Sequence, residues 1–409
     1  MDSKKYDYLI IGGGVAGVTA AETIREIDRA SSIAIISRER YPLYSRVLLP
    51  NYLKKRIDRD KLFLRKESDF TDKRIDFYLG EEMAFVDIKQ HQIGLLNRTI
   101  LGFNKLLIAS GGKVENWGPP EYQDSIFRLQ TIDDADRLFN SLDSIKNPVV
   151  IGGSFIALEF LEIFVVNGIK PTLLVRDPYF FGKILDPLGG QVFSENFERN
   201  GILTQFGDSI AEIFGQNKKF KIVTQGLRRL DCDSFAPGVG LSRDLDFWRG
   251  FGISVGKEGI LTNEYLETDN EGIFAAGDVA EFYDVITGKN RVLGNWTNSF
   301  LQGKAAGLNM VGRRAAFKGV SGYSITNFGF HITVLGDYKD FTNAAVRYDK
   351  VYKRYERFFL KDGILVGAVI INKFEDKAQI AKLIESKTKL GEYENKLSDL
   401  EFDIKNIPV

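Results

Sequence analysis

The feature that most limits how this chain can fold is a glycine-rich turn near its start. An apolar run over residues 8–11 ends in the spacing Gly12-x-Gly14-x-x-Gly17, and a helix-like segment follows. In such a strand–turn–helix the first glycine allows the tight turn, the second lets backbone amides approach a pyrophosphate, and the third lets helix and strand pack closely. Glu39, just past the next apolar strand, is placed to accept hydrogen bonds from ribose hydroxyls. The turn predicts a bound dinucleotide, held by Gly12, Gly14, Val15, Ala16 and Gly17.

A second turn with the same frame follows the apolar run at 149–151, but it is incomplete. It begins at Gly152, and Ser154 and Ala157 stand where the second and third glycines are expected. Two such turns predict two nucleotides in one chain, the layout of an enzyme that passes hydride from a nicotinamide to a flavin. Because the serine and the alanine add atoms at the pyrophosphate and at the helix–strand contact, we expect the second site to be the weaker one.

Composition excludes several other classes of protein. The length of 409 residues suits two or three domains, and Lys+Arg and Asp+Glu balance at 55 each, which indicates no bias toward nucleic acid. No run approaches the roughly 20 apolar residues of a membrane span. Cys232 is the single cysteine, which excludes an intrachain disulfide, a redox cysteine pair and a Cys-rich metal cluster. We expect a cytoplasmic protein in which neither His91, in a polar turn, nor His331, in a strand-like run, binds metal.

The chain repeats one plan at the scale of a domain. In each copy a glycine turn leads to a helix, at 16–27 and at 155–166, and then to a second apolar strand, at 33–36 and at 172–175. Strand, helix and strand in this order predict parallel sheets with crossover helices. The expected fold class is therefore α/β, with two Rossmann-like domains.

Each copy also contains short alternating segments, at 74–79 and at 219–223, which predict a small β-meander. Each closes on an apolar strand that ends in a glycine turn. After the second copy, another apolar strand ends at Gly277-Asp278, and a helix-like run covers 298–311. Ligands bind beyond the carboxyl ends of strands in open α/β sheets, so the Asp278 carboxylate is placed to hold the ribityl chain of a flavin.

The character of the sequence changes near Ser321. Segments 328–335, 355–360 and 365–371 alternate like antiparallel strands, and 376–390 reads as an amphipathic helix. These patterns predict a small third domain of the α+β class.

The motifs occur in the order found in the pyridine-nucleotide-dependent flavoprotein reductases. Besides the two glycine turns and Gly277-Asp278, they are Leu107-Ile-Ala-Ser-Gly111-Gly112, Arg128 followed by Asp133-Asp134-Ala135, and Glu159 in the second helix. The chain resembles most the NADH:rubredoxin and ferredoxin reductases and the flavin part of NADH-dependent nitrite reductase. Segments 39–49 and 296–306 and the C-terminal domain also resemble this branch, so the resemblance covers essentially the whole chain.

The resemblance implies FAD in the first domain, with its pyrophosphate at the first glycine turn, its adenosine ribose at Glu39 and its ribityl chain at Asp278. Arg46 and Arg128 would neutralise phosphate. Trp296 and the helix start beside it would place partial positive charge near the flavin pyrimidine. The remaining FAD contacts that we assign are Ser37, Arg38, Tyr44, Ala84, Ala109, Ser110, Gly111, Gly277 and Asn295.

The resemblance also implies that the nicotinamide stacks near Glu159, the one residue we assign to catalysis. Hydride transfer needs geometry and electrostatics rather than a protein acid or base. The NAD(P)H contacts that we assign are Gly152, Ser154, Phe155, Ile156 and Arg176.

Two departures concern this site. The second strand ends at Arg176 and lacks the acid expected for the ribose 2′-hydroxyl of NADH, so Arg176 either meets the 2′-phosphate of NADPH or is a solvated surface residue. Asn51 stands where the branch often carries a lysine that pairs with the counterpart of Glu159, and Lys54 is the candidate replacement.

The absence of a cysteine from the segment expected beside the flavin distinguishes this chain from several related classes of enzyme. Disulfide reductases and flavin peroxidases need a cysteine near the flavin, and segment 41–53 has none, so electrons must leave for an external carrier. Segment 51–66 is rich in basic residues and could steer an acidic rubredoxin or ferredoxin, or could be only a solvated face. The basic residues are Lys54, Lys55, Arg56, Arg59, Lys61, Arg65 and Lys66.

We therefore expect an FAD-dependent NAD(P)H oxidoreductase that passes electrons to a small carrier protein. The alternative is a flavoprotein electron-transfer subunit with a degenerate NAD(P) site. A membrane quinone reductase is disfavoured because segment 376–390 is rich in Lys and Glu, and a homodimer is compatible with the sequence. We expect FAD-binding parts at 1–115 and 243–320, an NAD(P)-binding domain at 116–242 and an α+β C-terminal domain at 321–409.

Overall fold

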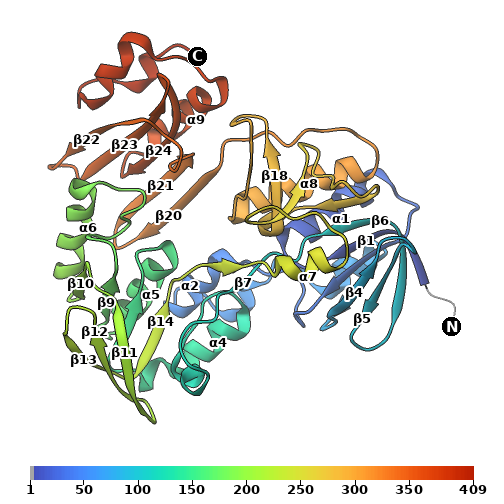
Figure 1. Cartoon of the computed structure of the whole chain (residues 1–409), viewed down its shortest axis with the longest axis horizontal. Helices are drawn as coiled ribbons and strands as arrows, with labels where there is room; N and C mark the ends of the chain where they lie inside the picture. Colours follow the sequence, from blue (N-terminus) through green and yellow to red (C-terminus); the bar gives the residue numbers. More distant parts are fainter. Residues whose placement is uncertain (1–3) are drawn as a thin grey trace. The chain divides into compact units, whose positions relative to one another are not determined.

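The computed structural model describes residues 4–409 and divides into two compact units. Unit 1 comprises Met1–Ser45, Asp60–Lys113 and Leu241–Ser321, and unit 2 comprises Arg46–Arg59, Val114–Gly240 and Gly322–Val409. Each unit therefore combines segments that lie far apart in the sequence, as the colours of Figure 1 show.

Unit 1 is built on a sheet with the strand order β3-β2-β1-β6-β5-β4, in which β17 also pairs with β6. Strands β3, β2, β1, β6 and β17 are parallel, with Ile11 beside Ile36 and Ile108. Residues of β2 are buried throughout, as is typical of a parallel strand covered on both faces. The strands are β1 (Lys4–Ile11), β2 (Ile33–Ser37), β3 (Ile75–Leu79), β4 (Met83–Asp87), β5 (Gln92–Leu95), β6 (Ile100–Ile108) and β17 (Ile273–Ala275).

The prediction of a meander strand at 74–79 is wrong. This segment forms β3, which extends the parallel sheet beside β2 with Ile75 opposite Ile33. The meander of the first copy is formed instead by β4 and β5 with the start of β6, which are antiparallel. Alternation alone does not distinguish an edge strand of a parallel sheet from a strand of a hairpin.

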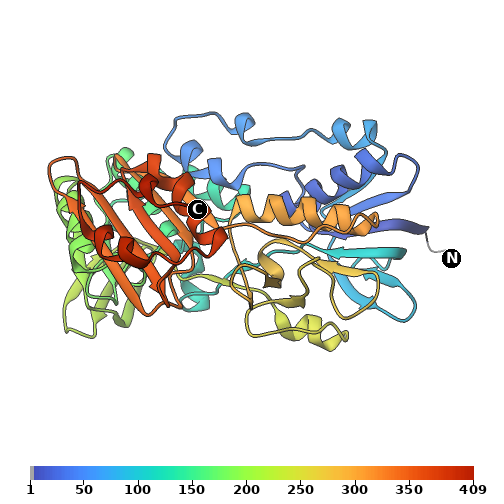
Figure 2. The same ribbon diagram turned by 90° about the horizontal axis from the view of Figure 1, so that it is seen from above.

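Two helices pack closely in unit 1, α1 (Val15–Ile27) and α8 (Trp296–Met310), which lie side by side in Figures 1 and 2. A Cβ at Gly303 would overlap the carbonyl oxygen of Ala16, so the missing side chain lets the helices approach. The other elements are η2 (Arg59–Leu62), α3 (Glu67–Asp72), β15 (Leu241–Ser242), α7 (Leu245–Gly250), β16 (Ile260–Thr262), η5 (Gly277–Val279), β18 (Ala280–Asp284) and β19 (Lys289–Arg291).

Unit 2 contains a second parallel sheet, with the order β10-β9-β8-β14. The predicted meander strand at 219–223 is confirmed as β12 of the antiparallel sheet β11-β12-β13. The strands are β8 (Pro148–Ile151), β9 (Thr172–Val175), β10 (Leu203–Phe206), β11 (Ile210–Gln216), β12 (Lys219–Thr224), β13 (Arg229–Cys232) and β14 (Ser234–Pro237). The helices are η1 (Arg46–Leu48), α2 (Leu49–Leu53), η3 (Pro120–Ser125), α4 (Ile132–Ser141), η4 (Leu142–Ser144), α5 (Phe155–Val166) and α6 (Pro187–Arg199), and β7 (Lys113–Val114) is a short strand at the unit boundary.

The C-terminal part of unit 2 is an antiparallel sheet with the order β20-β21-β24-β23-β22, drawn in red in Figure 2 with its helix α9. The predicted strands and helix of this α+β part are confirmed, with the helix shorter than expected. The elements are β20 (Gly322–Asn327), β21 (Phe330–Gly336), β22 (Asn343–Asp349), β23 (Arg354–Lys361), β24 (Ile364–Ile371), η6 (Phe374–Asp376), α9 (Lys377–Ser386), η7 (Gly391–Ser398) and η8 (Ile404–Asn406).

A buried ion network ties this sheet to the end of the chain. Arg347, 1% exposed, bonds to Glu356 and, at 3.2 Å, to Asp376. Lys373 lies 3.3 Å from both carboxylates, so two cations face two anions. The Arg347 guanidinium also donates to the carbonyl oxygen of Phe402 at 2.6 Å, which holds the C-terminal segment on the sheet.

Replacing Arg347 with methionine should destabilise unit 2 by about 3–5 kcal/mol, because two carboxylates would then share one cation in the interior. Urea unfolding measures the loss, and hydrogen exchange should show faster exchange in the segment around Phe402. Arg354→Met is the matched control, since Arg354 is exposed and lies over the Tyr352 ring. Equal stability of the two variants would contradict the role given to the network.

Candidate functional site

The first glycine turn has the close approaches that its spacing predicts. Gly12 has φ +116°, and a Cβ there would overlap the carbonyl oxygen of Ala109, the residue that follows β6. A Cβ at Gly17 would overlap the carbonyl oxygen of Gly12, so this glycine lets α1 pack on the turn. A Cβ at Gly14 would meet no described heavy atom within 4 Å. Two of the glycines are thus required by the fold, and Gly14 faces open space.

The helix behind this turn presents an open N-terminus. Gly14 is the N-cap of α1, no described side chain caps the helix, and its first turn contains no acidic residue. The first amides of a helix and its dipole attract anions. Together with the space in front of Gly14, this end of α1 fits the pyrophosphate of a dinucleotide.

The loops that follow the parallel strands of unit 1 meet at one edge of the sheet, because Ile11, Ile36, Ile108 and Ala275 are aligned across it. The sequence-predicted residues at this edge are Gly12, Gly14, Val15, Ala16, Gly17, Ser37, Arg38, Glu39, Ala109, Ser110, Gly111, Gly277 and Asp278. The arrangement brings together the residues assigned to the FAD phosphates, adenosine and ribityl chain.

Two carboxylates at this edge are oriented by neighbouring hydroxyls. Tyr44 donates its phenolic hydrogen to Glu39 Oε2. Ser299 Oγ donates to Asp278 Oδ1 at 3.0 Å. Both carboxylates are acceptors, which is the property that ribose or ribityl hydroxyls need.

Sequence reasoning missed Gln302, which is fully buried on α8. Its side-chain oxygen accepts from the backbone N–H of Gly277 at 2.7 Å and so fixes the turn that carries Asp278. Asn295, which we assigned to the cofactor, uses its Oδ1 to accept from Asn298 N at 2.9 Å and caps α8. Trp296 is the first residue of that helix, and Ala84 lies on β4 at a bulge.

Arg46 and Arg128 belong to unit 2, whereas the first glycine turn belongs to unit 1. Arg46 donates to the carbonyl oxygen of Gln130 at 2.9 Å, and Arg128 donates to the side chain of Gln123. Their assignment to phosphate stays a prediction.

The second glycine turn uses its serine as a helix cap. Ser154 Oγ accepts from Ala157 N at 3.2 Å and donates to the carbonyl oxygen of Gly238 at 3.0 Å. The hydroxyl is therefore engaged with the backbone at the start of α5 and after β14, where serine is a preferred N-cap. Gly152 keeps the positive φ, +103°, of the first residue of the turn. Phe155 and Ile156 begin α5, and Arg176 is exposed just after β9.

Lys54, the candidate replacement for a lysine at position 51, pairs with Glu159 in the structure. Its Nζ lies 3.0 Å from Glu159 Oε2, and its side chain is 2% exposed. The basic segment at 51–66 is consequently less available than the sequence indicates, because Lys54 is buried and Arg59 pairs with Asp136 at 2.8 Å.

Sequence reasoning also missed Glu162 and Asn327, which join Lys54 and Glu159. Lys54 bonds to Glu162 Oε2, and Asn327 Nδ2 lies 3.0 Å from Oε2 of both glutamates. One signal was available: Glu159 and Glu162 are three residues apart on a helix and therefore share a face.

Cys232 is buried, and burial, together with Asp233 and Asp231, raises the pKa of its thiol to about 12. The thiol therefore stays protonated at neutral pH and is a poor nucleophile. The prediction that Cys232 is structural agrees with this environment.

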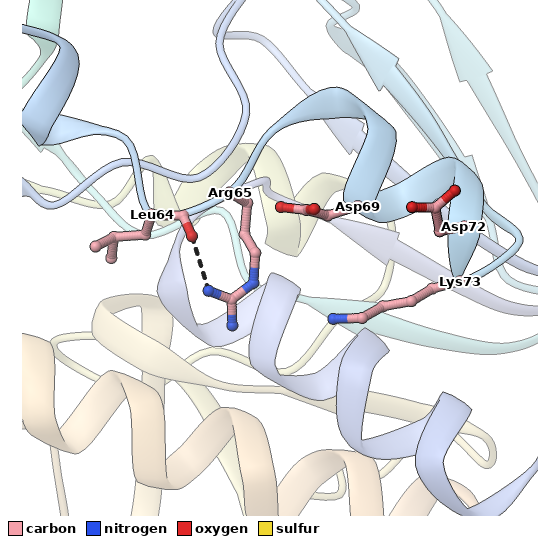
Figure 3. A pocket seen from close by; sticks show the side chains of 5 residues that line it. All are labelled: Leu64, Arg65, Asp69, Asp72 and Lys73. Atoms are coloured by element: carbon pink, nitrogen blue, oxygen red, sulfur yellow. Dashed lines mark hydrogen bonds between the residues drawn. The ribbon is translucent and has the colours of Figure 1, made fainter.

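A surface depression on unit 1 is lined by Leu64, Arg65, Asp69, Asp72 and Lys73 (Figure 3). Its two cations are already engaged, because Arg65 and Lys73 both bond to Glu22 of α1. Burial opposes ionisation of Glu22, but these two partners hold its pKa below the usual value. The depression therefore offers an anion no uncommitted charge.

Residues 4–409 contain no group of three or more His, Cys, Asp and Glu side chains that could hold a metal ion. Within the same residues, no helix combines the length and the apolar character needed to cross a membrane.

The fold and the first turn define a dinucleotide-binding α/β protein with a second, similarly built nucleotide domain. Residues 6–303 match the family described as pyridine nucleotide-disulphide oxidoreductase, and residues 324–388 match the rubredoxin NAD+ reductase C-terminal domain. The chain therefore belongs to the pyridine nucleotide-disulphide oxidoreductase family. It is an FAD-dependent NAD(P)H oxidoreductase, although it contains a single cysteine and so no intrachain disulfide.

Individual relatives cover nearly the whole chain. The NADH-rubredoxin oxidoreductase of Clostridium acetobutylicum is 27% identical over 94% of this chain and 95% of its own sequence. The structure of NADH:rubredoxin oxidoreductase from the same organism has a TM-score of 0.78 at 25% identity, covering 95% of this chain and 97% of that one. The ferredoxin reductase for the CYP199A2 system from Rhodopseudomonas palustris has a TM-score of 0.89 at 24% identity, covering 98% and 99%, and shows the same fold.

The glycines allow a matched pair of substitutions. Gly14→Ala should leave the fold intact, because its Cβ enters open space, but should lower FAD content by narrowing the approach of the pyrophosphate. Gly12→Ala should lower the stability of the apoprotein itself, because its Cβ would overlap a backbone carbonyl at a positive φ. Thermal melting of the apoproteins and the visible spectra of the purified variants separate the two effects. Normal FAD content in Gly14→Ala would argue against this turn as the pyrophosphate site.

Proposed function

We propose that this protein passes electrons from NAD(P)H through FAD to a small acidic carrier protein of the rubredoxin or ferredoxin kind. The observation that carries the proposal is the open, uncapped end of α1 behind a complete glycine turn, in a chain whose C-terminal part matches the rubredoxin NAD+ reductase C-terminal domain. When bound, FAD supplies the step from two-electron hydride chemistry to one-electron transfer.

In this proposal the chain's own residues bind and orient. The amides at Gly14 and the start of α1 hold the pyrophosphate, Glu39 accepts from the adenosine ribose, and Asp278 accepts from the ribityl chain. The remaining FAD contacts proposed are Val15, Ala16, Ser37, Arg38, Tyr44, Arg46, Ala84, Ala109, Ser110, Gly111, Arg128, Gly277, Asn295 and Trp296. For the nicotinamide nucleotide the second turn supplies Gly152, Ser154, Phe155 and Ile156, with Glu159 beside the ring.

The absence of a redox-active cysteine supports an external acceptor. The only thiol, Cys232, is buried and has a raised pKa, so no thiol is poised to accept electrons and keep them within the chain. We further propose the FAD domain at 1–115 and 243–320, the NAD(P) domain at 116–242 and a separate C-terminal domain at 321–409. A cytoplasmic location is proposed as well, because a reducing compartment suits a protein that lacks disulfides.

Stopped-flow mixing of the flavoprotein with NADH and with NADPH tests the first half-reaction. We expect at least one of them to bleach the visible flavin band, because Ser154 is occupied as a helix cap and leaves the turn in place. Arg176→Ala should weaken NADPH binding selectively if the exposed guanidinium meets the 2′-phosphate, and should change neither nucleotide if Arg176 is only solvated. Failure of both nucleotides would favour the alternative with a degenerate NAD(P) site.

The second half-reaction tests the carrier. Lys61 and Lys66 remain exposed in unit 1, so the double variant Lys61→Glu/Lys66→Glu should raise KM for rubredoxin or ferredoxin about tenfold at low salt. Its kcat with ferricyanide should not change, since that small acceptor needs no docking surface.

Lys89→Glu is the matched control, because Lys89 is an exposed lysine in the turn between β4 and β5 of the same unit. An equal rise of KM in this control would show that the effect comes from the overall charge of the protein and not from a docking surface at Lys61 and Lys66. An unchanged KM in the double variant would remove these lysines from the docking surface.

A further inference from the structure

The buried cluster around Lys54 contains one more carboxylate than a simple ion pair needs. Lys54 follows α2, Glu159 and Glu162 lie on α5, and Asn327 ends β20, all within unit 2. Exposed fractions of the side chains are 2% for Lys54, 12% for Glu159 and 9% for Glu162. The Lys54 ammonium and the Asn327 amide are shared by the two carboxylates.

The two carboxylates are not equally satisfied. Both carboxylate oxygens of Glu162 accept hydrogen bonds. Oε2 accepts from Lys54 Nζ and Asn327 Nδ2. Oε1 accepts from Phe328 N at 3.0 Å and lies 3.5 Å from Arg56 Nη2. The donors that reach Glu159 from the described residues, Lys54 and Asn327, both meet its Oε2. Glu162 thus faces two cations and a backbone amide, whereas Glu159 keeps one oxygen without a donor among the described residues.

This asymmetry decides which carboxylate carries the negative charge. Several hydrogen bonds to a carboxylate stabilise its ionised form, and a second carboxylate nearby favours protonation of the less well satisfied one. Burial raises the pKa of Glu159, Lys54 and Asn327 oppose the rise, and Glu162 adds to it. Tyr323, on β20, is the other titratable group near Glu159 and stays neutral, because burial and Glu159 raise its pKa.

We propose that Glu162 is a positioning residue that binds Lys54 and Arg56 as the ionised partner, and that it leaves Glu159 as the carboxyl group of the cluster that gains and loses a proton. In this proposal, the bond to Glu162 holds the Lys54 side chain in the cluster, although Lys54 lies three residues after Asn51, the position at which a lysine is expected. Resting on the proposed function, this makes the charge beside the nicotinamide depend on pH: ionised Glu159 attracts the positive ring of the oxidised nucleotide more than the neutral ring of the reduced one.

The proposal is tested on the FAD-loaded protein without any nicotinamide nucleotide, so its outcome does not depend on whether the second turn binds one. Infrared spectra recorded along a pH titration follow the carbonyl band of protonated carboxyl groups. In the wild type, Glu159 should titrate above the usual range of glutamate, and so should Glu356 of the Arg347 network, because burial raises the pKa of both. Glu159→Gln should lose the Glu159 part of this band and keep the Glu356 part. Glu198→Gln, an exposed change on α6, is the control and should keep both parts.

Two variants then separate positioning from simple structural support. Glu162→Gln should shift the Glu159 midpoint to lower pH, because Lys54 would serve Glu159 alone and the neighbouring negative charge would be gone. Arg56→Gln should shift the midpoint to higher pH, because Glu162 would lose one of its two cations and would compete more strongly with Glu159 for Lys54. Arg56 is half exposed, so this variant should fold even if Glu162→Gln does not.

Two outcomes of these titrations would overturn the proposal. It is overturned if the part of the band assigned to Glu159 is lost in Glu162→Gln and kept in Glu159→Gln, since the protonated group would then be Glu162. A midpoint that is unchanged or lowered in Arg56→Gln overturns it as well. The ratio of the affinities for NAD+ and NADH, measured against pH, should change at the same midpoints. If the infrared midpoints behave as expected but this ratio does not change with pH, the result counts against the proposed function and not against the proposal for the cluster.

Discussion

Backbone contact at Gly12 is the constraint on which the candidate FAD site depends. The carbonyl oxygen of Ala109 occupies the space that a Cβ at Gly12 would need, and the carbonyl of Gly12 does the same at Gly17. These contacts bring the turn after β1, the loop after β6 and the start of α1 together at the carboxyl edge of the sheet. Gly303 extends the series by letting α8 approach Ala16. A row of missing side chains therefore lets the positive end of α1 come close to the sheet edge. Backbone hydrogen bonds from Gly12 N to Ile36 O and from Ala109 N to Ile11 O also hold the turn and the loop there.

Constraints of this kind can be predicted from sequence because they are local. The requirement for Gly12, Gly14 and Gly17 arises within one strand, turn and helix, and the apolar runs around it identify the parallel strands. The failure at 74–79 has the opposite origin. Its alternation describes one half-exposed strand correctly, but whether that strand pairs with β2 or with a hairpin neighbour depends on contacts with residues about forty positions away in sequence, such as Ile33 beside Ile75.

The cluster around Lys54 also could not be predicted from local sequence, because its partners lie far apart in the chain. Its partners are separated by 105 residues between Lys54 and Glu159 and by 168 between Glu159 and Asn327. A lysine at 51 or at 54 fits the local sequence equally well, and only the packing of α2 against α5 selects the second. Ser154 illustrates a related limit. In the sequence it is only a glycine that has been replaced, whereas in the structure it caps α5 and donates to the carbonyl oxygen of Gly238. The second contact cannot be predicted locally, because Gly238 follows β14, far from Ser154 in sequence.

The two buried ion networks of unit 2 have similar chemistry and different consequences. Around Arg347, the buried guanidinium and the partly buried Lys373 face two buried carboxylates, and the guanidinium also holds backbone carbonyls of the C-terminal segment. Around Lys54, one of the two compensating cations, Arg56, is 48% exposed, so water and salt screen its charge. The second network is therefore incompletely neutralised, and Glu159, whose carboxylate has fewer donors, is the group that we propose takes up a proton. Since buried ion networks seldom stabilise a fold more than apolar packing does, stability alone gives no reason for an imbalance at this position. An imbalance on the first turns of the helix that begins at the second glycine turn does have a chemical use, because it keeps a titratable carboxyl group where a nicotinamide is expected to stack.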